Sequence, residues 1–317
     1  MSLPLKFSHF LQPRASIRQW ASQCLTVLSC LALVSGGSAI AADPFRTGAA
    51  ARPIGPALGS AFEAFFRHGS YLNSSQSLSI AESENPKEPL VYTLQAALAY
   101  MNEQPDQMLS LAKKTASVAQ AMKTQDKARS HLYLGIAQGL EGASYYLKDR
   151  DFGLVRAIPN VTTMLSEIDQ ARKLAPTDPE VNLIVGYVEA ILANQKMKRH
   201  EDALTSFRKA QPSYLALRGK ALVYRDAKDY PQAAAMVEKA LADAPKNPEL
   251  LYLKGQILAL QQKPVEAITY FDKALSLGRQ LPESTKRQIR KERGSQISKA
   301  SQGAVLGPAI PKKPVSQ

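Results

Sequence analysis

The sequence has few residues that support sulfur chemistry. Its 317 residues include two cysteines, Cys24 and Cys30, and a single tryptophan, Trp20. All three lie within residues 1–42, which have the features of a cleavable leader. Once that segment is removed, the remaining chain cannot form a disulfide, react through a thiolate or hold zinc through sulfur. The folded protein must then be stabilised by packing and not by cross-links.

Residues that carry catalysis or bind metals are also scarce. The chain has four histidines, and no two of them have a metal-binding spacing: His9, His68, His131 and His200. His200-Glu201 begins like a zinc-protease helix, but Leu204 stands where the second histidine is required. Gly219-Lys220 lacks the other residues of a phosphate-binding loop, and there is no Gly-x-Ser-x-Gly motif. The sequence therefore predicts a protein that is not an enzyme and that uses no cofactor, metal or small-molecule substrate.

The N-terminal segment combines a basic start, a short apolar run and small residues at its end. Residues 1–20 contain three basic residues and no acid, an apolar stretch covers residues 24–34, and the alanines Ala41 and Ala42 follow. This order is typical of a secretory signal peptide. We predict that residues 1–42 are such a signal, that it is cleaved after Ala41 or Ala42, and that the protein is exported to a periplasm.

Alternatives remain open for this segment and for the destination. The segment could be retained as a membrane anchor, although a spanning helix needs about 20 apolar residues and this run is shorter. Lipid attachment at Cys30 is a poor match, because more apolar residues follow that cysteine. The destination could be a thylakoid lumen instead of a periplasm.

Positive charge is concentrated near the C-terminus. The formal net charge is +13 over the whole chain and +10 without residues 1–42. Residues 279–317 hold nine basic and two acidic residues and so carry +7, whereas residues 43–278 are nearly neutral at +3. The excess of basic residues is therefore a property of the tail and not of the main body.

Helical periodicity with a recurring proline spacing dominates the chain beyond residue 58. An alanine followed after five and eight residues by prolines occurs three times, at Ala81/Pro86/Pro89, Ala171/Pro176/Pro179 and Ala240/Pro245/Pro248. Seven residues after the last proline of each set stands a small residue, namely Ala96, Gly186 or Gly255. Prolines end one helix and begin the next, and small residues let two antiparallel helices approach closely. A repeat of this length built from helix pairs indicates a solenoid.

The last two units align over their full length at an offset of 34 residues. Small and large residues recur in them at matching places: Ala233, Ala240, Ala267 and Ala274, with Tyr224, Val237 and Phe271. Together with Leu134-Gly135, Gly186 and Pro245, they resemble the tetratricopeptide repeat (TPR) family. The resemblance covers most of residues 58–278 and implies an all-α fold, a right-handed solenoid of antiparallel helix pairs, but it says little about function. The chain is also similar to exported TPR proteins of photosynthetic bacteria, which implies a compartment but no activity.

The composition and the resemblance divide the chain into four regions. We expect a signal peptide (1–42), a disordered linker (43–57), a TPR-like helical repeat domain of about six pairs (58–278) and a basic region (279–317). Within the last region, residues 282–300 are predicted to form a helix that caps the solenoid, and residues 301–317 to be disordered. The third pair contains about 17 extra residues in the segment 144–164.

Solenoids of this kind bind partners along the concave surface formed by the first helix of each pair. The alignment places six residues on this surface: Tyr187, Arg218, Leu222, Arg225, Tyr252 and Gln256. Because tyrosine and arginine are frequent interface anchors, we predict a groove with a cationic floor that binds a peptide or protein. The chaperone-tail clamp of some family members requires asparagine where Leu222 and Gln256 stand, so that ligand is not expected. The alternative, that these residues only solvate the surface, remains open.

The basic tail suggests a second kind of binding. Five of its cations lie close together in the sequence: Lys286, Arg287, Arg290, Lys291 and Arg293. Each lysine or arginine near an anionic membrane contributes roughly 1 kcal/mol, so the tail could hold the protein weakly on an anionic membrane or polymer. Nucleic acid is not expected, because residues 279–317 contain no aromatic side chain to stack on bases. A soluble charged cap is the simpler alternative.

Overall fold

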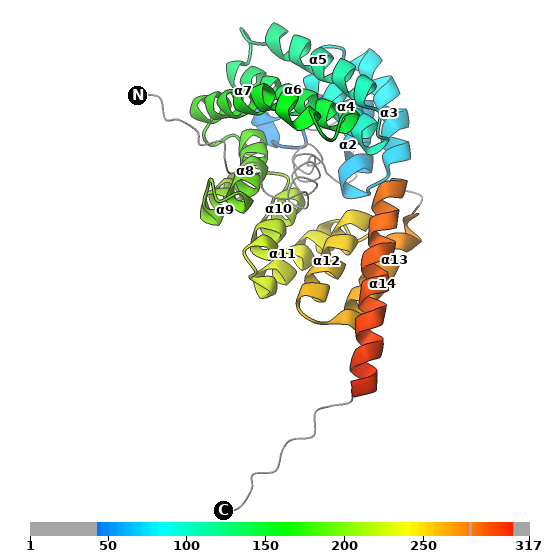
Figure 1. The fold of residues 1–317 in the computed structure, drawn as a ribbon. Helices are drawn as coiled ribbons and strands as arrows, with labels where there is room; N and C mark the ends of the chain where they lie inside the picture. The colour runs from blue at the N-terminus through cyan, green and yellow to red at the C-terminus, as the bar shows by residue number, and fades with distance from the viewer. Residues whose placement is uncertain (1–42, 279–280, 307–317) are drawn as a thin grey trace, which may run out of the picture.

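The structure, a computed structural model, describes residues 43–278 and 281–306. These residues form helices joined by turns, with no β-strand among them. Helices α2 to α13 make six consecutive antiparallel pairs, and α14 follows them as a single long helix (Figure 1). The predicted all-α solenoid of helix pairs with a capping helix is therefore confirmed. The predicted signal peptide and residues 307–317 of the predicted tail lie outside the described residues.

The helices of the first three pairs are α2 (Pro56–Phe62) with α3 (Tyr71–Glu84), α4 (Pro89–Met101) with α5 (Pro105–Ala121), and α6 (Lys127–Lys148) with α7 (Gly153–Leu174). Those of the next three are α8 (Pro179–Asn194) with α9 (His200–Lys209), α10 (Ser213–Asp226) with α11 (Tyr230–Asp243), and α12 (Pro248–Leu260) with α13 (Pro264–Ser276). Helix α14 spans Glu283–Leu306, and α2 continues into the π turn η3 (Glu63–Arg67). The earlier helix of each pair is its first helix.

Local sequence signals set the ends of these helices. Proline stands in the first turn of α4, α8 and α12, where its missing N–H costs nothing. The side chain of Asp178 caps α8 by accepting a hydrogen bond from the Val181 N–H at 3.0 Å. The turns inside four pairs each contain one residue with φ between 55° and 64°: Glu103, Lys196, Lys228 and Gln262. The same turn thus recurs along the chain, as a repeat protein requires.

Aromatic rings packed against glycine join the helices of the later pairs. The Phe207 ring of α9 lies between Gly186 of α8 and Gly219 of α10, so it holds three helices together. A Cβ atom added at Gly219 would lie 2.2 Å from Cζ of that ring. The predicted small residues Ala233 and Ala267 are fully buried, which confirms that the helices approach each other there.

The extra residues of the third pair lengthen both of its helices instead of forming a separate loop. Helices α6 and α7 have 22 residues each, and residues 149–152 connect them. Three glycines of α6 face α7: Gly135, Gly139 and Gly142 lie closest to Ile168, Met164 and Asn160, respectively. Because these glycines have no side chains, the two long helices pack closely along most of their length.

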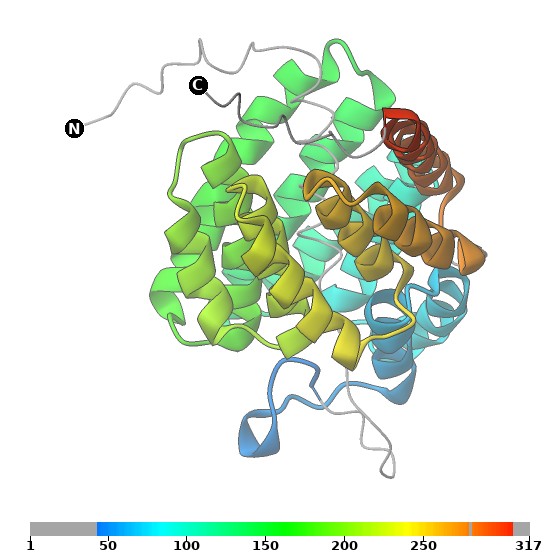
Figure 2. The ribbon, with the colours of Figure 1, turned by 90° about the horizontal axis from the view of Figure 1, so that it is seen from below.

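The row of pairs curves until the first pair meets the sixth (Figure 2). The side-chain amide of Asn247 donates a hydrogen bond of 2.6 Å to the carbonyl oxygen of Phe66. Arg67 donates through Nε to the carbonyl oxygen of Asp243 at 3.1 Å. Gly69, with φ of 58°, lies against the Pro248 ring, where a Cβ atom would clash. These contacts, between residues far apart in the sequence, close the curve.

Residues 43–55, which we call the strap, are ordered in the structure. Phe45 is 3% exposed and its ring packs edge-on against Phe62 at 5.6 Å. The Arg46 guanidinium donates to the Asp178 carboxylate at the start of α8. The expectation of a disordered linker over residues 43–57 is therefore wrong. The proline and alanine content of this segment is typical of a disordered linker. The segment is nevertheless held in place, by one aromatic and two arginine side chains and not by regular secondary structure.

Helix α14 covers the last pair. Leu281 and Ile289 are buried, and Arg293 pairs with Asp272 of α13 at 2.5 Å. The helix continues through residues 301–306, which corrects the expectation that disorder begins at residue 301. None of the helices in the two described stretches combines the length and apolar character that crossing a membrane would need.

Replacing Gly294 with alanine is expected to stabilise α14 by about 0.5–1 kcal/mol. Gly294 lies inside the helix, and an added Cβ atom would meet no other atom within 4 Å. Alanine therefore gains helix propensity without a clash. Hydrogen exchange of the α14 amides should slow by about three- to fivefold, whereas unchanged or faster exchange would contradict this reading of the helix.

Candidate partner-binding surface

Polar side chains link the first helices α8, α10 and α12 and the capping helix α14 in one continuous row. Asn194 donates to Asp226 at 2.5 Å, and Asp226 pairs with Arg225 at 2.8 Å. Arg225 also donates to the side-chain oxygen of Gln256 at 3.2 Å, and the Gln256 amide donates to Glu292 at 3.1 Å. We call these five residues and Tyr252 the polar row. It brings together three of the predicted binding residues, Arg225, Tyr252 and Gln256.

Tyr252 anchors the C-terminal end of the polar row. Its hydroxyl donates a hydrogen bond of 2.7 Å to Glu292 of α14, and Gln288 donates to the same carboxylate at 2.7 Å. Burial, followed by the charge of Glu292, raises the pKa of Tyr252 well above its usual range. The hydroxyl therefore stays protonated and acts as a donor at any physiological pH.

Arg218 and Leu222 lie on the same helix as Arg225 but have different surroundings. Arg218 pairs with Glu249 at 2.8 Å, and Glu249 also accepts a short hydrogen bond from Tyr71 of the first pair. Arg218 thus belongs to the contact that closes the curve, next to a cavity of about 10 Å³. That volume has room for about one water molecule and not for a ligand. Leu222 is half-buried and packs against the core.

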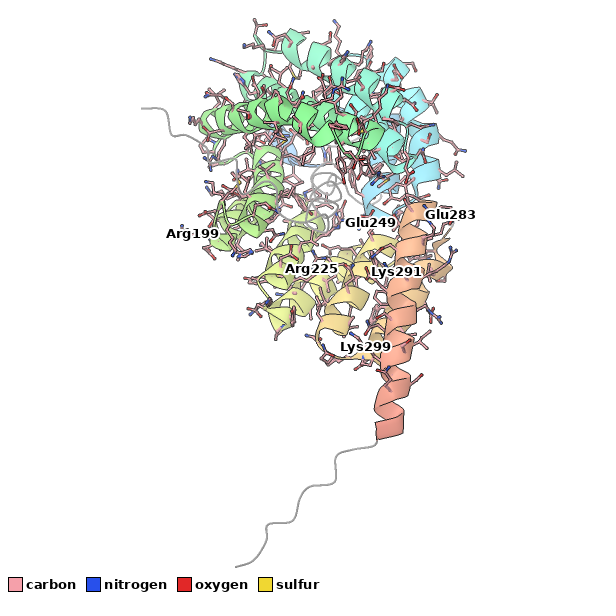
Figure 3. All side chains as sticks on the ribbon, in the orientation of Figure 1. Arg199, Arg225, Glu249, Glu283, Lys291 and Lys299 are labelled. Atoms are coloured by element: carbon pink, nitrogen blue, oxygen red, sulfur yellow. The ribbon has the colours of Figure 1, made fainter. Side chains whose placement is uncertain are left out.

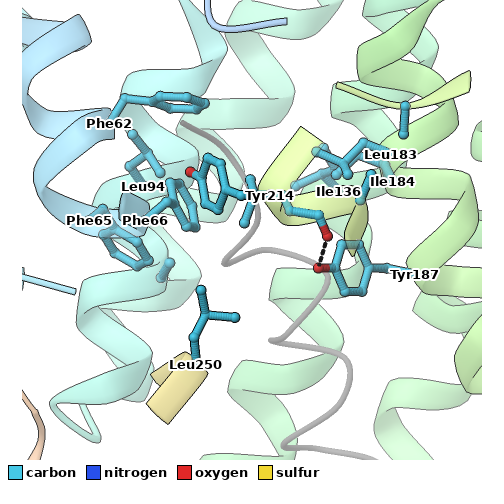
Figure 4. Packing of buried hydrophobic residues seen from close by; sticks show 14 of the residues in the cluster. Phe62, Phe65, Phe66, Leu94, Ile136, Leu183, Ile184, Tyr187, Tyr214 and Leu250 are labelled. Atoms are coloured by element: carbon cyan, nitrogen blue, oxygen red, sulfur yellow. Dashed lines mark hydrogen bonds between the residues drawn. The ribbon is translucent and has the colours of Figure 1, made fainter. Parts of the chain in front are cut away.

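The structure corrects two parts of the predicted groove. Tyr187 is 2% exposed, and its hydroxyl donates to the Leu215 carbonyl oxygen at 2.9 Å (Figure 4). Its ring meets Phe207 edge-on. It is a core residue and cannot anchor a partner, because α8 is covered by α9 and α10 on that side. The cationic floor is also wrong, since Arg218 and Arg225 each pair with a carboxylate. Figure 3 labels Arg225 on α10 and Glu249 at the start of α12.

A second polar cluster, not predicted from the sequence, lies at the N-termini of α4, α6 and α8. Arg129 of α6 is 5% exposed and joins Glu88, the residue before α4, to Glu180 of α8. Glu180 is 1% exposed and also accepts a hydrogen bond of 2.7 Å from the Tyr133 hydroxyl. Burying such charges is costly unless each is paired, and here each has several partners.

The strap supplies two more cations to this cluster. Arg46 donates to Glu180 at 2.9 Å, and Arg52 donates to Glu180 at 3.2 Å and to Asp126 at 2.6 Å. Burial alone raises the pKa of Glu180, but the charges of the three guanidinium groups outweigh it and lower that pKa to about 2. We call the eight charged residues the strap cluster: Asp43, Arg46, Arg52, Glu88, Asp126, Arg129, Asp178 and Glu180. The cluster fastens the strap across pairs two to four.

Acid is expected to destabilise the protein through Glu180. Its pKa is lowered from 4.5 to about 2 on folding, so its contribution is complete above pH 4.5 and is lost as the pH falls toward 2. Thermal unfolding measured from pH 6 to pH 2.5 should show a falling Tm below pH 4.5. In the Glu180→Gln variant, which cannot bind this proton, Tm should fall less steeply as the pH is lowered. A wild-type Tm that stays constant down to pH 2.5 would contradict the low pKa of Glu180.

The basic residues of the predicted tail site lie along α14, where Figure 3 labels Lys291 and Lys299. Arg287, Arg290 and Lys291 are exposed and share one face by their spacing of three and four residues. Lys286 and Arg293 pair with Glu283 and Asp272, and Arg290 lies 3.7 Å from the same Glu283. The structure thus leaves the side chains of three of the five predicted cations exposed, one of them beside a carboxylate.

In the part of the chain that the structure describes, no group of three or more histidine, cysteine, aspartate or glutamate side chains could hold a metal ion. His131 instead lies 2.6 Å from Glu167, which joins α6 to α7.

Comparison with known proteins identifies the repeats. Residues 218–284 match the family model of the tetratricopeptide repeat. Residues 218–284 carry tetratricopeptide repeats. The matched segment runs from α10 to the start of α14, and includes the pairs in which the TPR pattern of small and large residues is clearest in the sequence. The family predicted from that pattern is confirmed.

Several known proteins are similar to parts of the chain. Tetratricopeptide repeat protein 7A of Homo sapiens is 26% identical over 149 residues, which is 47% of this chain. The match covers 17% of that protein, so the chain spans about a sixth of the length of this curated relative. Among solved structures, yeast Tom70 is 14% identical, with 91% of this chain and 72% of that chain covered and a TM-score of 0.41. The matching chain in the TPR2AB-domain:pHSP90 complex of yeast Sti1 is also 14% identical. The match covers 76% of this chain and 96% of that chain, with a TM-score of 0.33.

Proposed function

We propose that this TPR protein is a non-enzymatic scaffold that binds a peptide or protein along the polar row. The observation that supports the proposal best is the continuity of the row across four helices, from Asn194 to Glu292. Its amide, guanidinium, carboxylate and hydroxyl groups are the donors and acceptors that a peptide backbone requires. Arg225 and Tyr252 are the residue types most often found as interface anchors.

The charges of the polar row narrow the chemistry of the partner. The row contains one arginine and two carboxylates, Asp226 and Glu292, so its net charge is −1. A partner segment with amide or basic groups complements it better than an acidic one. The proposed partner is therefore a neutral or weakly basic peptide segment.

We place this binding in an exported compartment, because residues 1–42 have the order of a secretory signal. A periplasm is the proposed destination. A thylakoid lumen and retention through an uncleaved N-terminal segment are the alternatives. Fractionation of the native host decides among them. The protein should be found in the periplasmic fraction, in the soluble fraction of the thylakoids, or in the membrane fraction, respectively.

Site-specific photo-crosslinking in the native host tests the binding surface. A photoreactive residue at position 222 sits on α10 beside the polar row, and one at Lys239 sits on α11, the second helix of the same pair, as a matched control. The expected result is a defined adduct from position 222 that Gln256→Ala weakens, and none from position 239. Equal adducts at the two positions, or none at position 222, would refute binding on this surface.

The exposed cations of α14 favour a second candidate function, adhesion to an anionic membrane or polymer. Arg287, Arg290 and Lys291 lie on one face, where three charges contribute roughly 3 kcal/mol, or about 100-fold in affinity, at an anionic surface. Vesicles with anionic lipid should bind the protein, and replacing the three residues by glutamine should abolish binding. The control replaces Lys113, Lys123 and Lys127, which are exposed on other elements. Binding that responds equally to both sets would exclude a specific role for α14.

A further inference from the structure

The strap begins inside the protein and not on its surface. Asp43 is 5% exposed, and its carboxylate accepts hydrogen bonds from the Phe45 N–H at 2.8 Å and from Arg46 at 3.0 Å. The same carboxylate accepts from the Arg52 N–H at 3.2 Å. Residues 43 to 45 are all buried, so the head of the strap is fixed next to the strap cluster.

The strap cluster contains more negative than positive charge. Three guanidinium groups, those of Arg46, Arg52 and Arg129, face five carboxylates, those of Asp43, Glu88, Asp126, Asp178 and Glu180. The Tyr133 hydroxyl also faces Glu180, and burial raises the pKa of Tyr133 so that it stays neutral. The N-termini of α4, α6 and α8 offset part of the net charge of −2 through their helix dipoles. A further buried cation at this place is therefore favoured.

We propose that removal of the leader supplies this cation. Hydrolysis of the peptide bond before Ala42 or before Asp43 adds the elements of water. It leaves a carboxylate on the leader and an α-ammonium group on the mature chain. With the cut before Asp43, the ammonium group belongs to a residue of the strap cluster itself. The mature N-terminus is then a bound, structural part of the fold, an inference that rests on the proposed export.

The burial of the strap head also sets the order of events. A peptidase needs the scissile bond in an accessible, extended segment, and Asp43 to Phe45 are buried once the strap is in place. The cut therefore precedes docking of the strap.

The N-terminus of the protein isolated from its native host is the first test. Mass spectrometry should find a chain that begins at Ala42 or Asp43. A start elsewhere, or an intact leader on the folded protein, would overturn the proposal.

The second test measures the α-amine itself in a purified chain with that start. Negative surroundings should raise its pKa above the ordinary value of about 7.7–8.0. An amine-reactive reagent at pH 7.5 should therefore label it at least about tenfold more slowly than a peptide of the same first residues. An equal labelling rate would show that the amine is exposed to solvent and would overturn the proposal.

Thermal unfolding shows whether the charge of the α-ammonium group is bound by the strap cluster or the α-amine is only buried. The chain with a free amine should melt about 2–4 °C above the same chain acetylated at its α-amine. Because folding raises the pKa of the amine, this advantage is complete below about pH 7.7 and disappears as the pH rises through the folded value. A Gly-Ser extension, which moves the charge by two residues, should melt like the acetylated form. If all three forms melt together, the amine is not bound.

Discussion

Replacing Glu180 with alanine is expected to lower the free energy of unfolding by about 3–5 kcal/mol, a large share of the total for a protein of this size. Glu180 is 1% exposed and is paired with the three arginines of the strap cluster. Its loss leaves guanidinium groups buried without their main partner and removes one of the two carboxylates that hold Arg46 at the start of α8. Urea denaturation followed by circular dichroism gives the change directly.

A surface ion pair provides the control for Glu180. Glu201 pairs with Arg208 at 2.9 Å, but both side chains are more than half exposed. Glu201→Ala should therefore change the free energy of unfolding by less than about 1 kcal/mol. A Glu180→Ala variant that loses no more than the Glu201 control would show that the strap cluster contributes little.

Replacing Phe207 with alanine is expected to cost about 3–5 kcal/mol. The ring is 1% exposed and lies between the glycines of α8 and α10, so its removal opens a cavity that backbone on both sides cannot fill. The matched control is Phe152→Ala, because Phe152 is 71% exposed and should lose almost nothing. Thermal and urea unfolding of the two variants compare the same substitution in the two environments.

A double-mutant cycle shows whether Phe207 acts as a wedge. Gly219→Ala alone should destabilise the protein by about 1–3 kcal/mol, because the added Cβ atom overlaps the ring. Combined with Phe207→Leu, it should cost less than the sum of the single changes, since the smaller side chain relieves the overlap. Strict additivity would contradict direct packing of the ring on Gly219.

The repeats were predictable because their signals are local and periodic. Proline in the first turn of α8 and α12 and buried alanines at Ala233 and Ala267 follow from the spacing of helix pairs alone. The capping role of residues 282–300 also followed, because Leu281, Ile289 and Ile297 recur every eight residues, and the first two are buried whereas Ile297 is exposed. The helix-forming signals are local as well in the third pair, so its roughly 17 extra residues lengthened the two helices instead of forming a separate loop.

The long-range features were not predictable, because no periodic signal marks them. Asn247 and Phe66 are 181 residues apart, and Arg46 and Asp178 are 132 apart. Arg129 and Glu180 look like ordinary charged residues in the first turns of helices. A shared sequence hint was the acidic cap before α6 and before α8, at Asp126 and Asp178, which places carboxylates at equivalent ends of neighbouring helices.

The candidate site was predicted in part. Arg225, Tyr252 and Gln256 do meet in the polar row, because one helical face repeats from pair to pair. The prediction that Tyr187 lies on the binding surface was wrong, because this residue follows Gly186 and points with it toward Phe207 and the core. The carboxylates that pair with the arginines come from neighbouring helices, and their positions depend on how the pairs stack.

The central claim is that the stacked pairs curve until the first meets the sixth, which fixes the shape of the surface that the polar row lines. Residues 43–317 contain no cysteine, so spin labels can be attached through His68→Cys and Lys246→Cys alone. These positions are near each other, and the Lys246 charge adds to burial and to Arg67 in lowering the pKa of His68. Pulsed electron paramagnetic resonance should give a single short and narrow distance between the labels. A long or broad distribution would contradict the closed curve.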